Sequence, residues 1–131
     1  MGLIQSKPLV YMFFTFLIVV TCTITASAET YTVNNSTGLE ADFTSIQDAI
    51  DASVKNDKIL VYEGIYTENV YVDKANVTIK SNTSNNDGII IKAKNTSNNV
   101  FTVLENNVSI KSFNIINAVG NYESGIMLNG A

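Results

Sequence analysis

A six-residue segment occurs twice in this chain, almost letter for letter. NVTIKS covers residues 76–81 and NVSIKS covers residues 107–112, so the second copy begins 31 residues after the first. In both copies apolar and polar residues alternate, which is the period of a β-strand. Self-similarity at a fixed period of about 20–50 residues is the signature of architectures in which equivalent segments stack on one another. The repeat therefore predicts two strands that pair in parallel and in register.

Stacking predicts the surroundings of each pair of equivalent residues. Neighbouring strands lie about 4.8 Å apart, so equivalent positions face the same environment. The equivalent pairs are Val77 with Val108, Ile79 with Ile110, Lys80 with Lys111, and Asn76 with Asn107. We expect the apolar pairs in the core and the lysines on the outer surface. We expect the asparagines at a corner, because Asn tolerates the left-handed backbone conformation and its amide can hydrogen-bond along the stack.

The chain after residue 57 has the pattern of short strands separated by turns. Clusters of Asn, Ser and Gly bound each segment. The predicted strands lie within residues 58–64, 69–73, 76–81, 88–94, 100–105, 108–112, 113–116 and 125–130. The alternation breaks after Ser112, so Phe113 and Ile115 point inward only if a corner shifts the phase by one residue. The pattern predicts an all-β protein, either a parallel stack or a β-sandwich, because both give short strands at this spacing.

One amphipathic helix is predicted, over about residues 43–54. Its apolar positions recur at helical spacing. They are Ile46, Ala49, Ile50 and Val54. Thr44 followed by Gln47 matches the capping box that begins a helix. A helix with one apolar face is expected to lie on another apolar surface.

The segment from this helix to the first copy of the repeat contains a second set of spaced residues. Together with the helix residues they are Phe43, Ile46, Ala49, Ile50, Gly64, Tyr66, Glu68 and Val70. On these residues the segment resembles the opening of right-handed parallel β-helix proteins of the pectin-lyase type, and its pattern is most similar to the first coil of pectinesterases. The later Asn-rich segments resemble NosD-type and archaeal surface β-helix proteins. The resemblance covers about residues 30–131.

The resemblance implies a right-handed parallel β-helix with a short N-terminal capping α-helix. In that family the helix covers the strand edges at the N-terminal end, and covered edges do not pair with other chains. No second cap is legible before Ala131. Because a stack needs both ends covered, we expect residues 29–131 to be the N-terminal part of a longer β-helix domain.

The first 28 residues have the pattern of a secretory signal peptide. Lys7 precedes an apolar run over residues 9–20, and Ala26, Ser27 and Ala28 supply the small residues of a cleavage site. We expect cleavage after Ala28 and a secreted or cell-surface location. An uncleaved membrane anchor and acylation of Cys22 are the alternatives. Cys22 is the one cysteine, so the cleaved chain has no thiol for disulfides or metal binding.

The composition argues against several classes of function. The chain contains no His and no Arg, and its net charge is −4. An acidic surface repels phosphate backbones, so we expect no nucleic-acid partner. The resemblance to pectinesterases and pectate lyases implies an Arg and paired Asp residues, and no matching motif occurs. No cofactor or metal site is predicted, since the Asp residues do not form a spaced ligand loop.

Two sets of residues are candidates for chemistry or binding. The carboxylates nearest to a catalytic pair are Glu63, Glu68 and Asp73. The favoured interpretation is that Glu68 satisfies the turn after Gly64, while the other two are solvated. Tyrosines whose rings could stack on sugars are Tyr62, Tyr66, Tyr71 and Tyr122. Tyr62 and Tyr66 could equally pack under the helix.

Six sequons for N-glycosylation are present. They begin at Asn34, Asn35, Asn76, Asn82, Asn95 and Asn107. We expect Asn82 and Asn95 to be the glycan acceptors, because they lie in predicted turns. Asn76 and Asn107 are expected to be corner residues instead.

The sequence favours a non-catalytic, extracellular or cell-surface β-helix module, structural or adhesive, with affinity for carbohydrate. The expected partners are polysaccharides or cell-wall components, with membrane contact only through the signal segment or a downstream anchor. One alternative is the N-terminal fragment of a polysaccharide-acting enzyme whose catalytic coils lie beyond residue 131. Another is a NosD-type periplasmic accessory protein.

Overall fold

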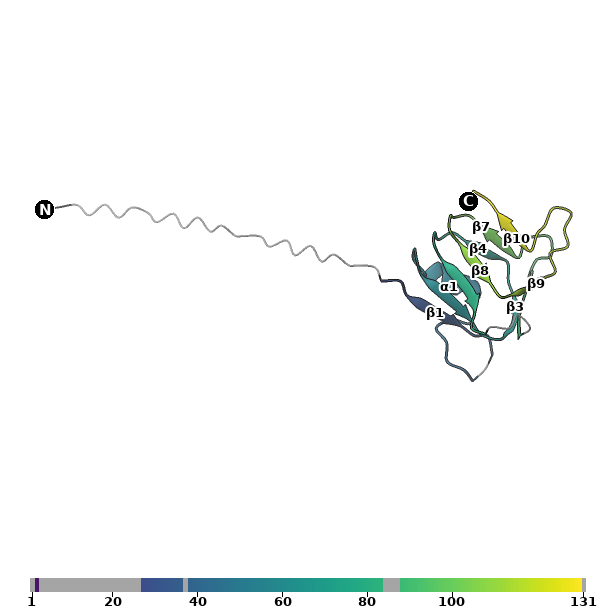
Figure 1. Cartoon of the computed structure of the whole chain (residues 1–131), viewed down its shortest axis with the longest axis horizontal. Coiled ribbons are helices and arrows are strands. Elements are labelled where there is room, and N and C mark those ends of the chain that lie inside the picture. Colours follow the sequence, from purple (N-terminus) through teal and green to yellow (C-terminus); the bar gives the residue numbers. More distant parts are fainter. Residues whose placement is uncertain (1, 3–26, 37, 84–87, 131) are drawn as a thin grey trace.

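The computed structural model describes residues 2, 27–36, 38–83 and 88–130 (Figure 1). The predicted leader and Cys22 lie almost wholly outside these residues. Within them the protein is mostly strands in parallel sheets with one short helix, which confirms the all-β class. No helix in this part of the chain is long and apolar enough to span a membrane.

The described residues form one helix and ten strands. In chain order they are β1 (Thr30–Val33), α1 (Ile46–Ala52), β2 (Lys58–Val61), β3 (Gly64–Thr67), β4 (Val70–Val72), β5 (Thr78–Ser81), β6 (Ile89–Lys92), β7 (Phe101–Val103), β8 (Ser109–Lys111), β9 (Asn114–Ile116) and β10 (Ile126–Leu128). All eight strands predicted from the sequence are present. Strands β1 and β3 are additional.

The strands form three sheets, in the orders β1-β2-β5-β8, β3-β6-β9 and β4-β7-β10. From β2 onward the chain visits the three sheets in the same order three times. Each strand pairs in parallel with the equivalent strand of the previous visit. Every strand pair in the described residues is parallel, which does not fit the antiparallel sheets of a β-sandwich.

The repeated segment pairs as predicted. Ile79 lies opposite Ile110 and Lys80 lies opposite Lys111 in the β5–β8 pair. Ile79 is buried, whereas Ile110 packs against the core but stays partly exposed. The difference arises because β8 is the outermost strand of its sheet.

Asparagines form the predicted ladder at one corner. Asn76 and Asn107 adopt left-handed backbone conformations with φ of 61° and 58°. The Asn107 Nδ2 donates to Asn76 Oδ1 at 3.2 Å. The Asn76 Nδ2 donates in turn to Asn56 Oδ1 at 2.9 Å, so the ladder extends to Asn56, which also has positive φ. Ser112 lies at the other predicted corner and has a φ of 63°. It precedes Phe113, which packs against the core.

The helix covers the apolar core at the β1 end of the sheets. It packs against β1, β2 and β4, and it lies beside β1, away from β9 and β10 (Figure 1). Ile46, Ala49 and Ile50 are fully buried, as the periodicity predicts. Val54 is 53% exposed and lies beyond the helix, so its place on the buried face was wrong.

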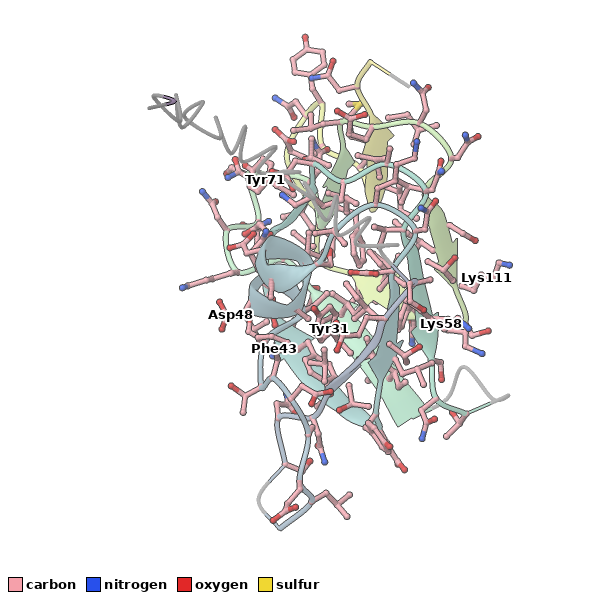
Figure 2. The ribbon with its side chains drawn as sticks, turned by 90° about the vertical axis from the view of Figure 1, so that its left-hand side faces the viewer. Tyr31, Phe43, Asp48, Lys58, Tyr71 and Lys111 are labelled. Atoms are coloured by element: carbon pink, nitrogen blue, oxygen red, sulfur yellow. The ribbon has the colours of Figure 1, made fainter. Side chains whose placement is uncertain are left out.

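The helix is shorter than the predicted 43–54, and its start also differs. Ser45, not Thr44, is the N-cap, and its Oγ accepts from Asp48 N at 3.3 Å. Phe43 lies before the helix and forms a parallel bridge with Val33. Its ring meets the Tyr31 ring edge-on at 5.6 Å, and Figure 2 shows the two side by side.

Glu68 completes the N-terminus of the helix. Its Oε1 accepts from Ile46 N at 3.1 Å, and its Oε2 accepts from Gln47 N at 3.0 Å and from Ser45 Oγ at 3.1 Å. A carboxylate is favourable at the positive end of a helix. The prediction that Glu68 satisfies the turn after Gly64 was therefore wrong: it binds a helix more than twenty residues earlier in the chain.

The opposite end of the three sheets exposes apolar side chains. No described strand pairs with the outer edge of β8, β9 or β10. Ile126 and Leu128 are 41% and 67% exposed, although the residues paired with them, Phe101 and Val103, are buried. This end has no helix comparable to α1 within residues 88–130.

Candidate functional site

The four candidate tyrosines lie in different surroundings. Tyr66 is only 1% exposed, and its Oη donates to Tyr62 O at 2.9 Å and to Val33 O at 3.3 Å. Burial raises the pKa of the Tyr66 hydroxyl. Because both faces of its ring are packed in the core, Tyr66 offers no face to a sugar, which corrects its place among the contact candidates.

Two of the other tyrosines are exposed but do not line the hollow described below. Tyr71 on β4 is 47% exposed, and Tyr122 between β9 and β10 is 89% exposed. Figure 2 shows Tyr71 on the same side as Asp48 of α1, and Lys58 and Lys111 on the other side. Tyr62, which is half-buried, is the candidate that lines a concave surface.

This concave surface is a hollow of about 490 Å³ near the β1 end of the sheets. It is formed by the loop between β1 and α1, the turn between β2 and β3, and the segment after β5. Its lining residues are Asn34, Ser36, Leu39, Tyr62, Glu63, Gly64 and Thr83. The lining thus combines a carboxylate, an amide, hydroxyl groups, an aromatic ring and an aliphatic side chain.

Asn34 contributes an unpaired donor to this region. The residue is 3% exposed, its backbone N–H donates to Phe43 O at 2.9 Å, and its Oδ1 accepts from Ser36 N at 2.9 Å. Its Nδ2 is buried and has no hydrogen-bond partner among the residues that the structure describes. A buried donor without a partner costs about 1–3 kcal/mol. Because this donor is enclosed, a ligand in the hollow would reach it only after a change in the Asn34 side-chain conformation.

The turn between β2 and β3 positions Tyr62 and Glu63 at the rim of the hollow. Tyr62 N donates to Val33 O at 2.8 Å, and the Tyr62 carbonyl accepts from the buried Tyr66 Oη. The Asn35 side chain lies against Gly64, where an added Cβ would collide with Asn35 Oδ1. A side chain at position 64 would therefore displace the Asn35 side chain, whose Nδ2 donates to Ile65 O at 2.6 Å.

Glu63 presents a carboxylate that is free within the described part of the chain. Its stem packs over Gly88, because a Cβ at Gly88 would lie 2.8 Å from Glu63 Cγ. None of the hydrogen bonds or ion pairs among the described residues involves the Glu63 carboxylate. It is therefore available to accept hydrogen bonds from a ligand.

The other two candidate carboxylates are engaged elsewhere. Glu68 binds the helix N-terminus, and Asp73 forms an ion pair with Lys74 at 2.8 Å. Each of the three candidate carboxylates thus has a different set of contacts. The residues that the structure describes also hold no group of three metal-ligating side chains.

The two preferred sequons are accessible. Asn82 and Asn95 are both exposed, although Asn95 also pairs with Asn69, whose Oδ1 accepts from Asn95 N at 2.7 Å. Glycosylation at either residue stays a prediction. Asn34 also begins a sequon, but its burial leaves no room for a glycan.

Comparisons with protein-family models, with curated proteins and with solved structures find no match to this chain. Function is therefore inferred from the hollow itself. Sequence reasoning identified Tyr62 and Glu63 but missed Asn34, Ser36 and Leu39. The run of residues 34–38, Asn-Asn-Ser-Thr-Gly, has the composition of an exposed loop, and nothing in it signals a buried amide.

Proposed function

We propose that this protein is a non-catalytic, extracellular or cell-surface module that binds carbohydrate in the hollow beside Tyr62. The fold we propose is a right-handed parallel β-helix with α1 as its N-terminal cap. The rotation of the chain through three parallel sheets supports this fold. The rule that parallel connections are right-handed supports the hand.

The observation that carries the carbohydrate proposal is the combination of Tyr62, Glu63 and Asn34 around one hollow. An aromatic face suits the apolar face of a sugar ring, and Tyr provides that face together with a polar tip. The Glu63 carboxylate would accept hydrogen bonds from sugar hydroxyls, and the enclosed Asn34 amide would donate one once its side chain turns into the hollow. Sugar hydroxyls act as donors and acceptors, so one ligand can satisfy both groups.

The extracellular location rests on the leader pattern of residues 1–28. It makes polysaccharides and cell-wall components the natural partners. The enzyme-fragment and NosD-type alternatives stay predictions, since no arrangement of the described side chains favours either one.

We expect Tyr62→Ala to weaken oligosaccharide binding about tenfold, which corresponds to about 1.4 kcal/mol. The reason is the loss of the one aromatic face in the hollow. Calorimetric titration with cellulose-, chitin-, xylan- and galacturonate-derived hexasaccharides measures the affinity. Tyr122→Ala is the matched control, because Tyr122 is exposed but lies outside the hollow.

The control variant should bind like the unchanged protein. Failure of all four hexasaccharides to bind the unchanged protein would refute the carbohydrate proposal. Equal loss of affinity in Tyr62→Ala and Tyr122→Ala would contradict the assignment of the binding site to the hollow.

A further inference from the structure

Asp57, in the turn before β2, is a buried carboxylate that has no cationic partner within the described part of the chain. The residue is 1% exposed. Its Oδ2 accepts from Val54 N at 2.7 Å, which closes the turn, and its Oδ1 accepts from Glu29 N at 2.9 Å. No lysine forms an ion pair with Asp57 in the ranges that the structure describes. Buried charges in proteins are normally paired, because isolated ones are costly.

The backbone nitrogen beside Asp57 belongs to the residue that follows the predicted cleavage site. Ser27, Ala28 and Glu29 are exposed and lie outside any strand, so a protease can reach the bond. Hydrolysis would add water across the Ala28–Glu29 peptide bond, leaving a carboxylate on Ala28 and an α-ammonium group on Glu29. The ammonium nitrogen would occupy the position of the present Glu29 N, at 2.9 Å from Asp57 Oδ1.

We propose that removal of the leader by a signal peptidase creates an α-ammonium group at Glu29, and that this group forms an ion pair with the buried Asp57 carboxylate. Cleavage would then stabilise the folded protein as well as separate it from the leader. A neutral amide donor would be replaced by a charged one, and hydrogen bonds between charged groups are about twice as strong as neutral ones. The pair forms without any movement of the chain. The proposal rests on the leader cleavage included in the proposed function, but it is independent of sugar binding.

The surroundings of Glu29 favour a positive charge. Tyr31 on β1 donates to Glu29 Oε2 at 3.1 Å, and this bond, together with the negative charges of Glu29, Asp57 and Asp42, raises the pKa of the Tyr31 hydroxyl. Asp42, in the loop before α1, accepts from Thr32 N and Thr32 Oγ1. The lysines next to Asp57 in the chain are Lys55 and Lys58, both exposed. Acidic groups therefore dominate around the new terminus.

The test compares two forms of the chain that differ only at Glu29: residues 29–131 with a free α-amino group, and the same residues with that group acetylated. Both contain all the helix and strand residues of the fold. At pH 6 the free form is expected to melt about 4–8 °C higher. In Asp57→Asn the two forms should melt at the same temperature. The Glu29 side chain is identical in both forms, so its charge does not contribute to the difference in melting temperature.

The pH dependence separates an ion pair from a general effect of acetylation. An α-amino group has a pKa of about 7.7–8.0 in an unfolded chain, and pairing with Asp57 raises it in the folded state. The advantage of the free form is thus complete below about pH 7.7 and is lost as the pH rises through the raised value. This measurement needs only the unsubstituted sequence, so it decides the question even if Asp57→Asn does not fold.

Three results would overturn the proposal: equal melting temperatures at pH 6, a difference that persists unchanged at pH 10, or a difference that survives in Asp57→Asn. The processing step has its own readout. Mass spectrometry of the exported full chain should give a protein that begins at Glu29. An exported protein with any other first residue would refute processing at this bond while leaving the sugar-binding proposal untouched.

Discussion

Replacing Ile79 with Ala is expected to lower the free energy of unfolding by about 2–5 kcal/mol. Ile79 is fully buried and lies in register between Ile59 on β2 and Ile110 on β8. The neighbouring strands are fixed by their backbone hydrogen bonds, so the core cannot close around the cavity. Chemical denaturation followed by circular dichroism measures the loss.

Two other substitutions calibrate this result. Lys80→Ala changes an outward-facing neighbour and should stay within about 0.5 kcal/mol of the unchanged protein. Ile110→Ala should cost less than Ile79→Ala, because Ile110 is only partly buried on the outermost strand. The double isoleucine variant should deviate from additivity by about 0.5 kcal/mol or more, since contacting residues couple. Additive effects would contradict the stacked contact.

Replacing Glu68 with Ala is expected to lower the free energy of unfolding by about 1.5–3 kcal/mol. The carboxylate accepts three hydrogen bonds at the start of α1, from Ile46 N, Gln47 N and Ser45 Oγ. The helix has only seven residues, and a helix this short does not form without tertiary contacts. Thermal unfolding of the purified variant gives the loss.

Glu63→Ala is the matched control for Glu68→Ala, because Glu63 is an exposed glutamate whose carboxylate has no hydrogen-bond partner among the described residues. It should change stability by no more than about 0.5 kcal/mol. Equal melting temperatures for Glu68→Ala and the unchanged protein would contradict the role of Glu68 in beginning the helix.

The sequence predicts the parts of the fold that local periodicity and repetition determine. The repeated segment predicts the register of the β5–β8 pair. Asn76 and Asn107, the first residues of its two copies, predict the asparagine corner. The buried helix face follows from its spacing. Strand β3 was missed because it begins at Gly64, where the predicted strand over residues 58–64 ends. Strand β1 was missed although Tyr31 and Val33 alternate with Thr30 and Thr32.

The parts that depend on distant contacts were not predictable in the same way. Glu68 follows a strand in the sequence, and only the folding of the chain brings it to the helix N-terminus. Likewise, Asn34 and Tyr62 are far apart in the chain and meet at one hollow only because β1 and β2 pair. The burial of Asn34 depends on its neighbours in space, and the surrounding sequence contains no signal for it.

The most direct test of the central claim is to map a bound sugar onto the protein by NMR. The probe is the hexasaccharide that binds most tightly in the calorimetric titrations, added to isotope-labelled protein. We predict that the largest shifts occur at the side-chain amide of Asn34 and at the backbone amides of Ser36, Glu63 and Gly64, with none at Tyr122. Shifts centred on Tyr71 or Tyr122, with the Asn34 side chain unchanged, would contradict the assignment of the hollow as the carbohydrate site.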